Sequence, residues 1–279
     1  MINNFILIGF DRSGTSAISK AISGHPQVNL VYRPFNSGPI RKKMYTILDE
    51  GNTTQEDKLF FQELEKNSFY SDYVVSTWHE KYSDIGNDFE KEKLHLLITN
   101  INHFSVAWVK NQYPKIEQWA IWRDPKYILN SCMKNNFFND WYQDSLGFLV
   151  ETVSKNTLLN HQFSWIISDI VNQSSVVKVA FIIAVRNYFL FYHINPRKII
   201  SYDLFKVNPD LSLKHLCDYF NLDIKKFSFS KYLDMDLNSI PSVDGYSKHK
   251  KDVITYDLSH EELINRLFYP LYELYPTNN

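Results

Sequence analysis

Short apolar runs alternate with amphipathic segments along the first half of this chain. The apolar runs cover residues 4–9, 28–32, 94–99 and 117–122. Each has the length of a strand that is buried on both faces. Between them, apolar residues recur at helical spacing from Thr15 to Ser23 and around Phe104 to Asn111. The first helix is expected to stop at Gly24, because Pro26 cannot continue it.

This alternation of strands and helices predicts an α/β fold. We expect three layers, α/β/α, around a central and mainly parallel sheet. Two more polar segments, at about 40–95 and 137–175, are expected to be helical insertions laid over the site. The most apolar stretch, Val176 to Tyr192, contains Lys178, Arg186 and Asn187. It therefore predicts a buried helix and no membrane span, since a span needs about 20 nearly uncharged residues.

Composition narrows the class of protein without identifying it. Of the 279 residues, 44% are hydrophobic and 16% aromatic, enough for one large core, so we expect a single domain over residues 1–279. A net charge of −1 argues against a general nucleic-acid or anionic-membrane binder. Cys132 and Cys217 both fall in predicted helices, where a free cysteine is commonly buried. No disulfide framework is expected.

The first candidate site follows the first strand. Gly9, four further residues and Gly14-Thr15-Ser16 give the frame of a phosphate-binding loop that lacks its lysine. In the usual loop, the lysine reaches the β and γ phosphates and the next hydroxyl holds Mg²⁺. Here Thr15 takes the lysine position, and Arg12 supplies a cation two residues before Gly14. Backbone N–H groups and a helix N-terminus still predict an anion site.

A second candidate site follows the strand at residues 117–122. This strand ends on Arg123, and Ser131 follows eight residues later, roughly two turns into the next helix. The two side chains can converge on one phosphate, with bidentate bonds from the arginine. Open α/β sheets bind ligands at this carboxyl edge of their strands. A third segment, Lys198 to Leu204, predicts a strand ending near Tyr202 and followed by a helix.

Together these three segments resemble the sulfotransferases that use 3′-phosphoadenosine-5′-phosphosulfate (PAPS), and bacterial carbohydrate-type members in particular. The resemblance covers most of the chain as far as about residue 223 and implies a P-loop NTPase-like fold. It implies that PAPS is the donor, that PAP is the product and that no metal takes part. It places the 5′-phosphosulfate on Arg12, Ser13, Gly14, Thr15 and Ser16, the 3′-phosphate on Arg123 and Ser131, and the adenine on Tyr202.

The catalytic base departs from the family pattern. Carbohydrate-type members have a glutamate after the second strand, where this chain has Arg33, and a guanidinium remains protonated. Cytosolic members have Lys-x-His at a register that falls here on Thr99 and Ile101. His103 lies just beyond that strand, and its imidazole is suited to proton transfer. We therefore expect His103 as general base, with Arg33 and Arg12 as charge-stabilising cations.

Other histidines and charged segments are weaker candidates. His79 and Glu80 form an acid/base-capable pair in the first insertion, and His25 follows the first helix. The basic run from Lys248 to Lys251 resembles, without its full pattern, the family segment that closes on the 3′-phosphate. Such short charge runs are most often exposed to solvent.

The expected function is sulfuryl transfer from PAPS to a hydroxyl of a sugar, glycan or other small acceptor. Aromatic residues in the two insertions favour a glycan, although the same residues are also typical of a core. Family members of the Golgi carry an N-terminal membrane anchor, whereas this chain begins on its first strand, so we expect a cytoplasmic enzyme. The sequence leaves the oligomeric state open. The alternatives are a nucleotide-dependent small-molecule kinase and a PAP-binding protein without catalysis.

Overall fold

A parallel sheet forms the centre of the protein. The computed structural model describes residues 3–31, 46–66, 95–100, 102–223, 229 and 256–275. Within them, five parallel strands lie in the order β2-β3-β1-β4-β5. Their bounds are β1 Asn3–Ile8, β2 Val28–Val31, β3 His95–Asn100, β4 Glu117–Trp122 and β5 Ile199–Ser201. The predicted α/β class with a parallel sheet is confirmed.

Each face of the sheet has its own core, and strand periodicity explains why. Successive side chains of a strand point to opposite faces. In β1, Phe5 and Leu7 belong to one apolar cluster, whereas Ile6 and Ile8 belong to the other. All four are fully buried. Strand β1 therefore has no polar face. Helices cover both faces of the sheet at this strand.

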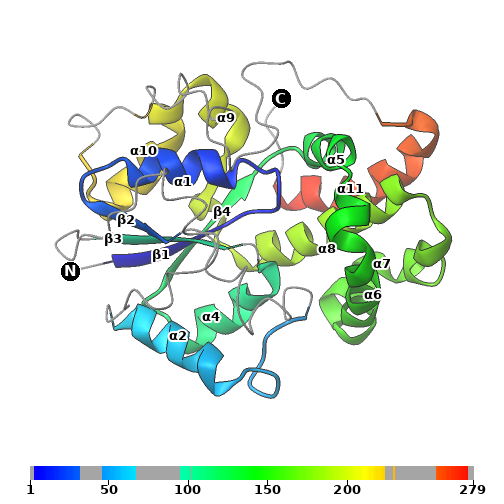
Figure 1. Ribbon diagram of the computed structural model, residues 1–279, viewed down its shortest axis with the longest axis horizontal. Helices are drawn as coiled ribbons and strands as arrows, with labels where there is room; N and C mark the ends of the chain where they lie inside the picture. The colour runs from blue at the N-terminus through cyan, green and yellow to red at the C-terminus, as the bar shows by residue number, and fades with distance from the viewer. Residues whose placement is uncertain are drawn as a thin grey trace.

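Helices on the two faces complete the three layers (Figure 1). One face carries α1 (Thr15–Ser23), α9 (Tyr202–Val207) and α10 (Pro209–Phe220), drawn above the sheet. The other carries α2 (Gln55–Glu65) and α4 (Val106–Gln112), drawn below it. Helix α1 has the predicted bounds and ends at Gly24, whose N–H bonds the carbonyl of Lys20.

A buried helix, α8 (Ser175–His193), organises the remaining part of the fold. Around it lie α5 (Pro125–Lys134), α6 (Leu146–Lys155), α7 (Thr157–Ile167) and α11 (Glu261–Leu274) (Figure 1). By length and composition α8 is the one helix among the described residues that could cross a membrane, with a mean hydropathy of 1.5. However, 83% of that apolar window is buried inside the protein. The prediction of a buried core helix is confirmed.

The insertion at residues 137–175 is helical, as predicted. Besides α6 and α7 it contains a π-helical turn at Phe138–Tyr142 and 3₁₀ turns at Gln143–Ser145 and Ile170–Asn172. Of the other predicted insertion, the structure describes residues 46–66 and includes α2, while residues 67–94 lie outside the described part.

Two local boundaries differ from the sequence prediction. The strand predicted to end near Tyr202 ends one residue earlier, at Ser201, because the Ser201 hydroxyl accepts the Leu204 N–H at 3.2 Å and starts α9. The helix predicted around Phe104 begins as a 3₁₀ turn at His103–Ser105, with Asn102 as its cap, before α4 continues it. Both differences come from side-chain caps, which stop or start an element at one residue.

Candidate functional site

The loop between β1 and α1 turns sharply at the carboxyl edge of the sheet. The Ser13 N–H donates to the Phe10 carbonyl at 3.0 Å. Arg12 and Gly14 have φ angles of 68° and 94°, in the left-handed region. For a non-glycine residue such as Arg12 this conformation costs roughly 1–2 kcal/mol. Left-handed residues in such a loop turn successive N–H groups to one side and form an anion-binding concavity.

Both glycines of this loop stand where a side chain does not fit. A Cβ on Gly14 would lie 2.1 Å from the ring of Tyr202, in addition to the strain of its φ angle. A Cβ on Gly9 would lie 2.6 Å from the hydroxyls of Ser13 and Thr15. Those two hydroxyls bond each other at 3.1 Å and are buried. The glycines thus let the loop, α9 and β4 approach one another closely.

Three predicted ligand residues from distant parts of the chain meet beside this loop. Arg12 Nε donates to the Ser131 hydroxyl at 3.0 Å, across 119 residues of sequence. Arg123 Nη1 donates to the Arg12 carbonyl at 2.6 Å. The Arg123 guanidinium also lies over the Tyr202 ring, 5.1 Å from its centroid. Two cations, a hydroxyl and an aromatic ring therefore surround one corner of the sheet.

The junction of β4 and α5 is held from outside the sheet. Asp124 caps α5, accepting the Lys126 N–H at 2.8 Å. The same carboxylate oxygen accepts the Tyr272 hydroxyl of α11 at 3.0 Å. Lys126 also pairs with Glu261 at 2.6 Å. Burial, followed by the charge of Asp124, raises the pKa of Tyr272, so this hydroxyl remains a donor at neutral pH. Helix α11 thereby fixes the residue next to Arg123.

A buried polar network lies on the other side of the loop. The Tyr142 hydroxyl donates to Asp11 Oδ2 at 3.0 Å, and Arg186 Nη1 lies 3.9 Å from the same oxygen. Arg186 Nη2 lies 3.2 Å from His103 Nδ1. The Arg186 guanidinium is 4.6 Å from the ring centroid of Phe10. Loop, α8 and the turn after β3 are thus joined by one set of contacts.

The predicted base His103 lies within this network. Its side chain is fully buried. A guanidinium carries donors only, so His103 Nδ1 accepts from Arg186 and the neutral ring carries its proton on Nε2. Its assignment as general base stays a prediction. Arg33, His79, Glu80 and the segment from Lys248 to Lys251 lie outside the described residues.

His25 lies far from these groups. It follows the carboxyl end of α1, next to the start of β2, and therefore at the opposite edge of the sheet. Its Nδ1 accepts the Gln27 N–H at 3.2 Å, and burial lowers the pKa of its imidazole. His25 is therefore a packed structural histidine. Ser16, in the first turn of α1, is on the same edge as the loop and is partly exposed.

Cys132 lies beneath the site, on α5. It is fully buried, and both cysteines of the chain are free, as predicted. Burial raises the pKa of the Cys132 thiol, and the negative charge of Asp11 adds to this effect. The thiol is therefore protonated at neutral pH and packs as an apolar group.

A cavity of about 460 Å³ opens at the other end of α5 from Arg123. It lies between the end of α5, the start of α8 and the segment before α11, and its polar lining includes Lys134, Ser174, Asp257 and His260. It is distinct from the corner that Arg12 and Arg123 surround. Among the residues that the structure describes, no group of three or more His, Cys, Asp or Glu is arranged to hold a metal ion.

Sequence reasoning missed Asp11, Tyr142 and Arg186 as site residues. A signal existed for Arg186, because a charged residue interrupts the most apolar stretch of the chain. Such a residue is buried only when it is paired. Asp11 is adjacent to Arg12, but its position in a phosphate-binding loop has no required residue type, so the pattern gives no signal for it. Tyr142 has no signal beyond its place in an aromatic insertion.

Comparison with known proteins finds similarity to solved structures but none to a family model. No protein-family model matches the chain, and no curated protein matches it in sequence. Among solved structures, the chain is similar to a sulfotransferase from Alicyclobacillus acidocaldarius. The identity is 12%, the match covers 79% of this chain and 81% of that chain, and the TM-score is 0.39. A likeness this distant carries no argument about function, which must be argued from the residues of the site.

Proposed function

We propose that this protein is a sulfotransferase that moves a sulfuryl group from PAPS to a hydroxyl acceptor. The observation that carries the proposal is the convergence of Arg12, Arg123 and Ser131 beside a left-handed glycine loop. The sequence motifs predict two anion sites, one on the loop and one on the β4–α5 junction. Arg12 contacts both Ser131 and Arg123, so the two predicted anion sites are adjacent. A ligand with a phosphate-bearing group at each end, such as PAPS, requires two such adjacent sites.

The donor set fits PAPS chemically. Arginine guanidinium, serine hydroxyl and backbone N–H groups all donate hydrogen bonds to phosphate or sulfate oxygens. Helix α1 has no acidic residue in its first turn and no side-chain cap, so its positive end is open to an anion. The Tyr202 ring is 6% exposed and lies against both Gly14 and Arg123, so it borders the same corner; its contact with an adenine stays a prediction.

When bound, PAPS supplies a sulfuryl group with a phosphate oxygen as its leaving group. The part of this chain is to hold the donor and to stabilise the negative charge that grows on that oxygen. Arg12 is placed for this second task, since it comes from the loop itself and is oriented by Ser131. Arg123 is oriented by the Arg12 carbonyl and holds the other phosphate.

A sugar or glycan is the proposed acceptor class, and the proposed location of the enzyme is the cytoplasm. The acceptor class is supported by the aromatic insertion next to the site, where the ring centroid of Phe137 lies 5.8 Å from the Arg12 guanidinium. Aromatic rings provide flat apolar surface, which suits the apolar face of a sugar ring.

The first experiment compares nucleotides by thermal stability. PAP is expected to raise the melting temperature far more than ADP or 5′-AMP, because a ligand that binds only the folded state stabilises it in proportion to its affinity. Transfer is then measured with [³⁵S]PAPS against a panel of monosaccharides and oligosaccharides. Equal shifts for PAP and ADP would contradict the proposal. A PAP shift without transfer to any acceptor would favour a PAP-binding protein.

Metal dependence separates this proposal from a kinase. Thr15 stands where a P-loop NTPase has the lysine that binds the β and γ phosphates. Sulfuryl transfer in EDTA should therefore match transfer in Mg²⁺. A strict requirement for Mg²⁺, together with transfer of phosphate from ATP, would show that the protein is a kinase.

A further inference from the structure

The carboxylate of Asp11 is held in place on the side of the β1–α1 loop that faces Tyr142 and Arg186. Asp11 is adjacent in sequence to Arg12, in the loop proposed to bind the phosphosulfate. Tyr142 donates to its Oδ2 at 3.0 Å, and the Arg186 guanidinium lies 3.9 Å from the same atom. Its side chain is 17% exposed, whereas that of Arg186 is fully buried. The Asp11 side chain is thus partly exposed, while its guanidinium partner is enclosed by the protein.

Several contacts fix the side chain of Arg186. Its Nη2 lies 3.2 Å from His103 Nδ1, and its guanidinium lies over the Phe10 ring. A fully buried guanidinium is costly unless a negative charge compensates it. Asp11 supplies that charge from the loop. The pairing in turn restricts Asp11 to one orientation next to the donor site.

Asp11 suits proton transfer better than His103 does. A general base must reach the acceptor hydroxyl, directly or through one water. His103 is fully buried and its Nδ1 accepts from Arg186, so its remaining ring nitrogen carries a proton. The Asp11 side chain is partly exposed, and its Oδ2 accepts the Tyr142 hydroxyl. Asp11 lies in the same loop as Arg12, whereas His103 lies in the turn after β3.

We propose that Asp11 is the general base of the transfer, with Tyr142 and Arg186 as its positioning residues. This inference rests on the proposed function. The acceptor O–H bond breaks and its proton passes to the Asp11 carboxylate. The electron pair of the acceptor oxygen forms the new S–O bond. The S–O bond to the 5′-phosphate breaks, and its electron pair stays on the phosphate oxygen of PAP, next to Arg12.

The test compares Asp11→Asn with Asp144→Asn, an exposed carboxylate on the neighbouring turn. Transfer from [³⁵S]PAPS is measured to the best sugar of the panel, or to water as released sulfate if no sugar reacts. A positioned base contributes about 10²- to 10⁴-fold, so Asp11→Asn should lower kcat by that factor. Asp144→Asn should leave kcat within about twofold of the wild type.

A second readout does not depend on turnover. As the base, Asp11 would lie on the acceptor side of the sulfate, so its negative charge should repel PAPS more than PAP, whose 5′ end stops at the phosphate. Asp11→Asn should therefore tighten PAPS about 3- to 10-fold relative to PAP in calorimetry without acceptor, as expected for charges a few ångströms apart near a surface. Asp144→Asn should leave this ratio unchanged. An unchanged ratio and full activity in Asp11→Asn would overturn the proposal.

Two further variants separate a base from a structural residue. Tyr142→Phe removes the hydrogen bond that orients the carboxylate and should lower kcat while leaving the KM for PAPS unchanged. His103→Gln keeps an acceptor for Arg186 and should lose less than tenfold in kcat. A 10²-fold loss in His103→Gln with an active Asp11→Asn would instead identify His103 as the base. Failure of PAP to bind the wild type would contradict the proposed function itself and would not bear on the choice between Asp11 and His103.

Discussion

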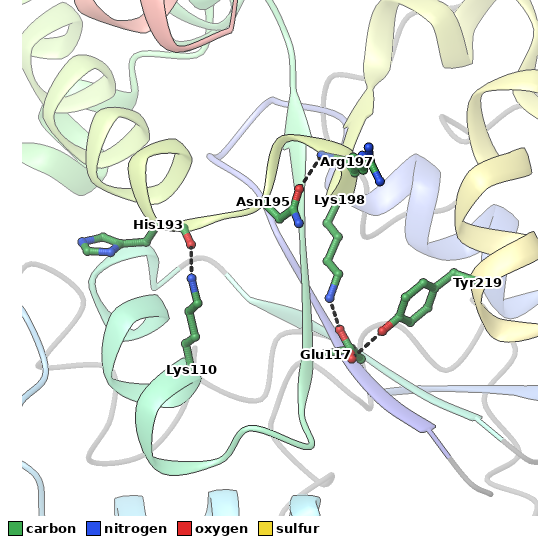
Figure 2. A network of polar contacts seen from close by, with 7 residues as sticks. All are labelled: Lys110, Glu117, His193, Asn195, Arg197, Lys198 and Tyr219. Atoms are coloured by element: carbon green, nitrogen blue, oxygen red, sulfur yellow. Dashed lines mark hydrogen bonds and ion pairs between the residues drawn. The ribbon is translucent and has the colours of Figure 1, made fainter.

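The two ends of β4 and β5 carry similar residues that are arranged in opposite ways. At the amino ends, Lys198 pairs with Glu117, and the Tyr219 hydroxyl donates to the same carboxylate at 2.6 Å (Figure 2). At the carboxyl ends, Arg12 and Arg123 lie beside a hydroxyl, a backbone carbonyl and aromatic rings. Charges at the amino edge neutralise one another, whereas cations at the carboxyl edge are brought together.

This difference separates a structural cluster from the proposed binding site. Bringing two guanidinium groups to one corner costs electrostatic energy that a bound anion would recover. The carboxyl edge also contains the left-handed Arg12, whose conformation costs free energy. The amino edge combines an ion pair with a neutral hydrogen bond and needs no ligand. Variants at the two edges should therefore separate effects on binding from effects on stability.

Arg123→Ala is expected to have the largest effect on binding. It removes the cation that is proposed to hold the 3′-phosphate, and losing one member of a buried charge pair costs about 2–5 kcal/mol. PAP affinity should fall about 30- to 5,000-fold in calorimetry. Lys198→Ala at the amino edge is the control and should leave PAP affinity within about twofold. Equal losses in the two variants would remove the distinction between the edges.

Gly14→Ala should damage both stability and binding. The alanine would have to keep a left-handed φ, which costs roughly 1–2 kcal/mol, and its Cβ would displace the Tyr202 ring. Urea denaturation should show this loss, and PAP should no longer raise the melting temperature. Gly147→Ala, in α6, is the matched control: its Cβ meets nothing within 4 Å, so stability should rise by up to about 1 kcal/mol. A stable, PAP-binding Gly14→Ala protein would contradict the described loop geometry.

Glu117→Gln should lower stability slightly and leave PAP binding unchanged. It removes the charge partner of Lys198 in a half-buried pair, and such pairs contribute about 1 kcal/mol or less. The measurement is the urea midpoint, with PAP calorimetry alongside. Glu151→Gln is the control, because its pair with Lys155 is exposed and should contribute less. A change in PAP affinity in Glu117→Gln would mean that contacts at the amino edge of the sheet influence binding at its carboxyl edge.

The smallest expected effect is a loss of stability at alkaline pH. The hydrogen bond from Tyr219 to Glu117, with burial and the carboxylate charge adding to it, raises the pKa of this phenol to about 12. Since the pKa is raised above its ordinary value of about 10, the contribution is fully present below pH 10 and is lost as the pH rises through about 12. Tyr219→Phe should show a weaker alkaline decline of the urea midpoint. An identical decline in both proteins would contradict this contact.

Much of the fold follows from local patterns in the sequence. Strand β4 and helix α1 have the predicted bounds, because the apolar stretch Trp119 to Trp122 stops at Arg123 and Gly24 ends the helix. Arg12, Ser131 and Arg123 were predicted as ligand residues from their spacing, and their contacts place them together. Boundaries at Ser201 and His103 differed, because single side-chain caps decided them.

The sequence by itself determined the order of the strands and helices along the chain and the burial of α8, and it predicted the residues of two anion sites. Periodicity and turn residues act over a few positions, so they can be recognised without tertiary contacts. Only the tertiary structure decided that Asp11 faces Tyr142 and Arg186, and that Arg186 contacts His103. These residues lie on segments that are distant in sequence, and packing around α8 brings their side chains together. No local pattern records such a contact, because the free energy that favours it arises only when the buried charges meet.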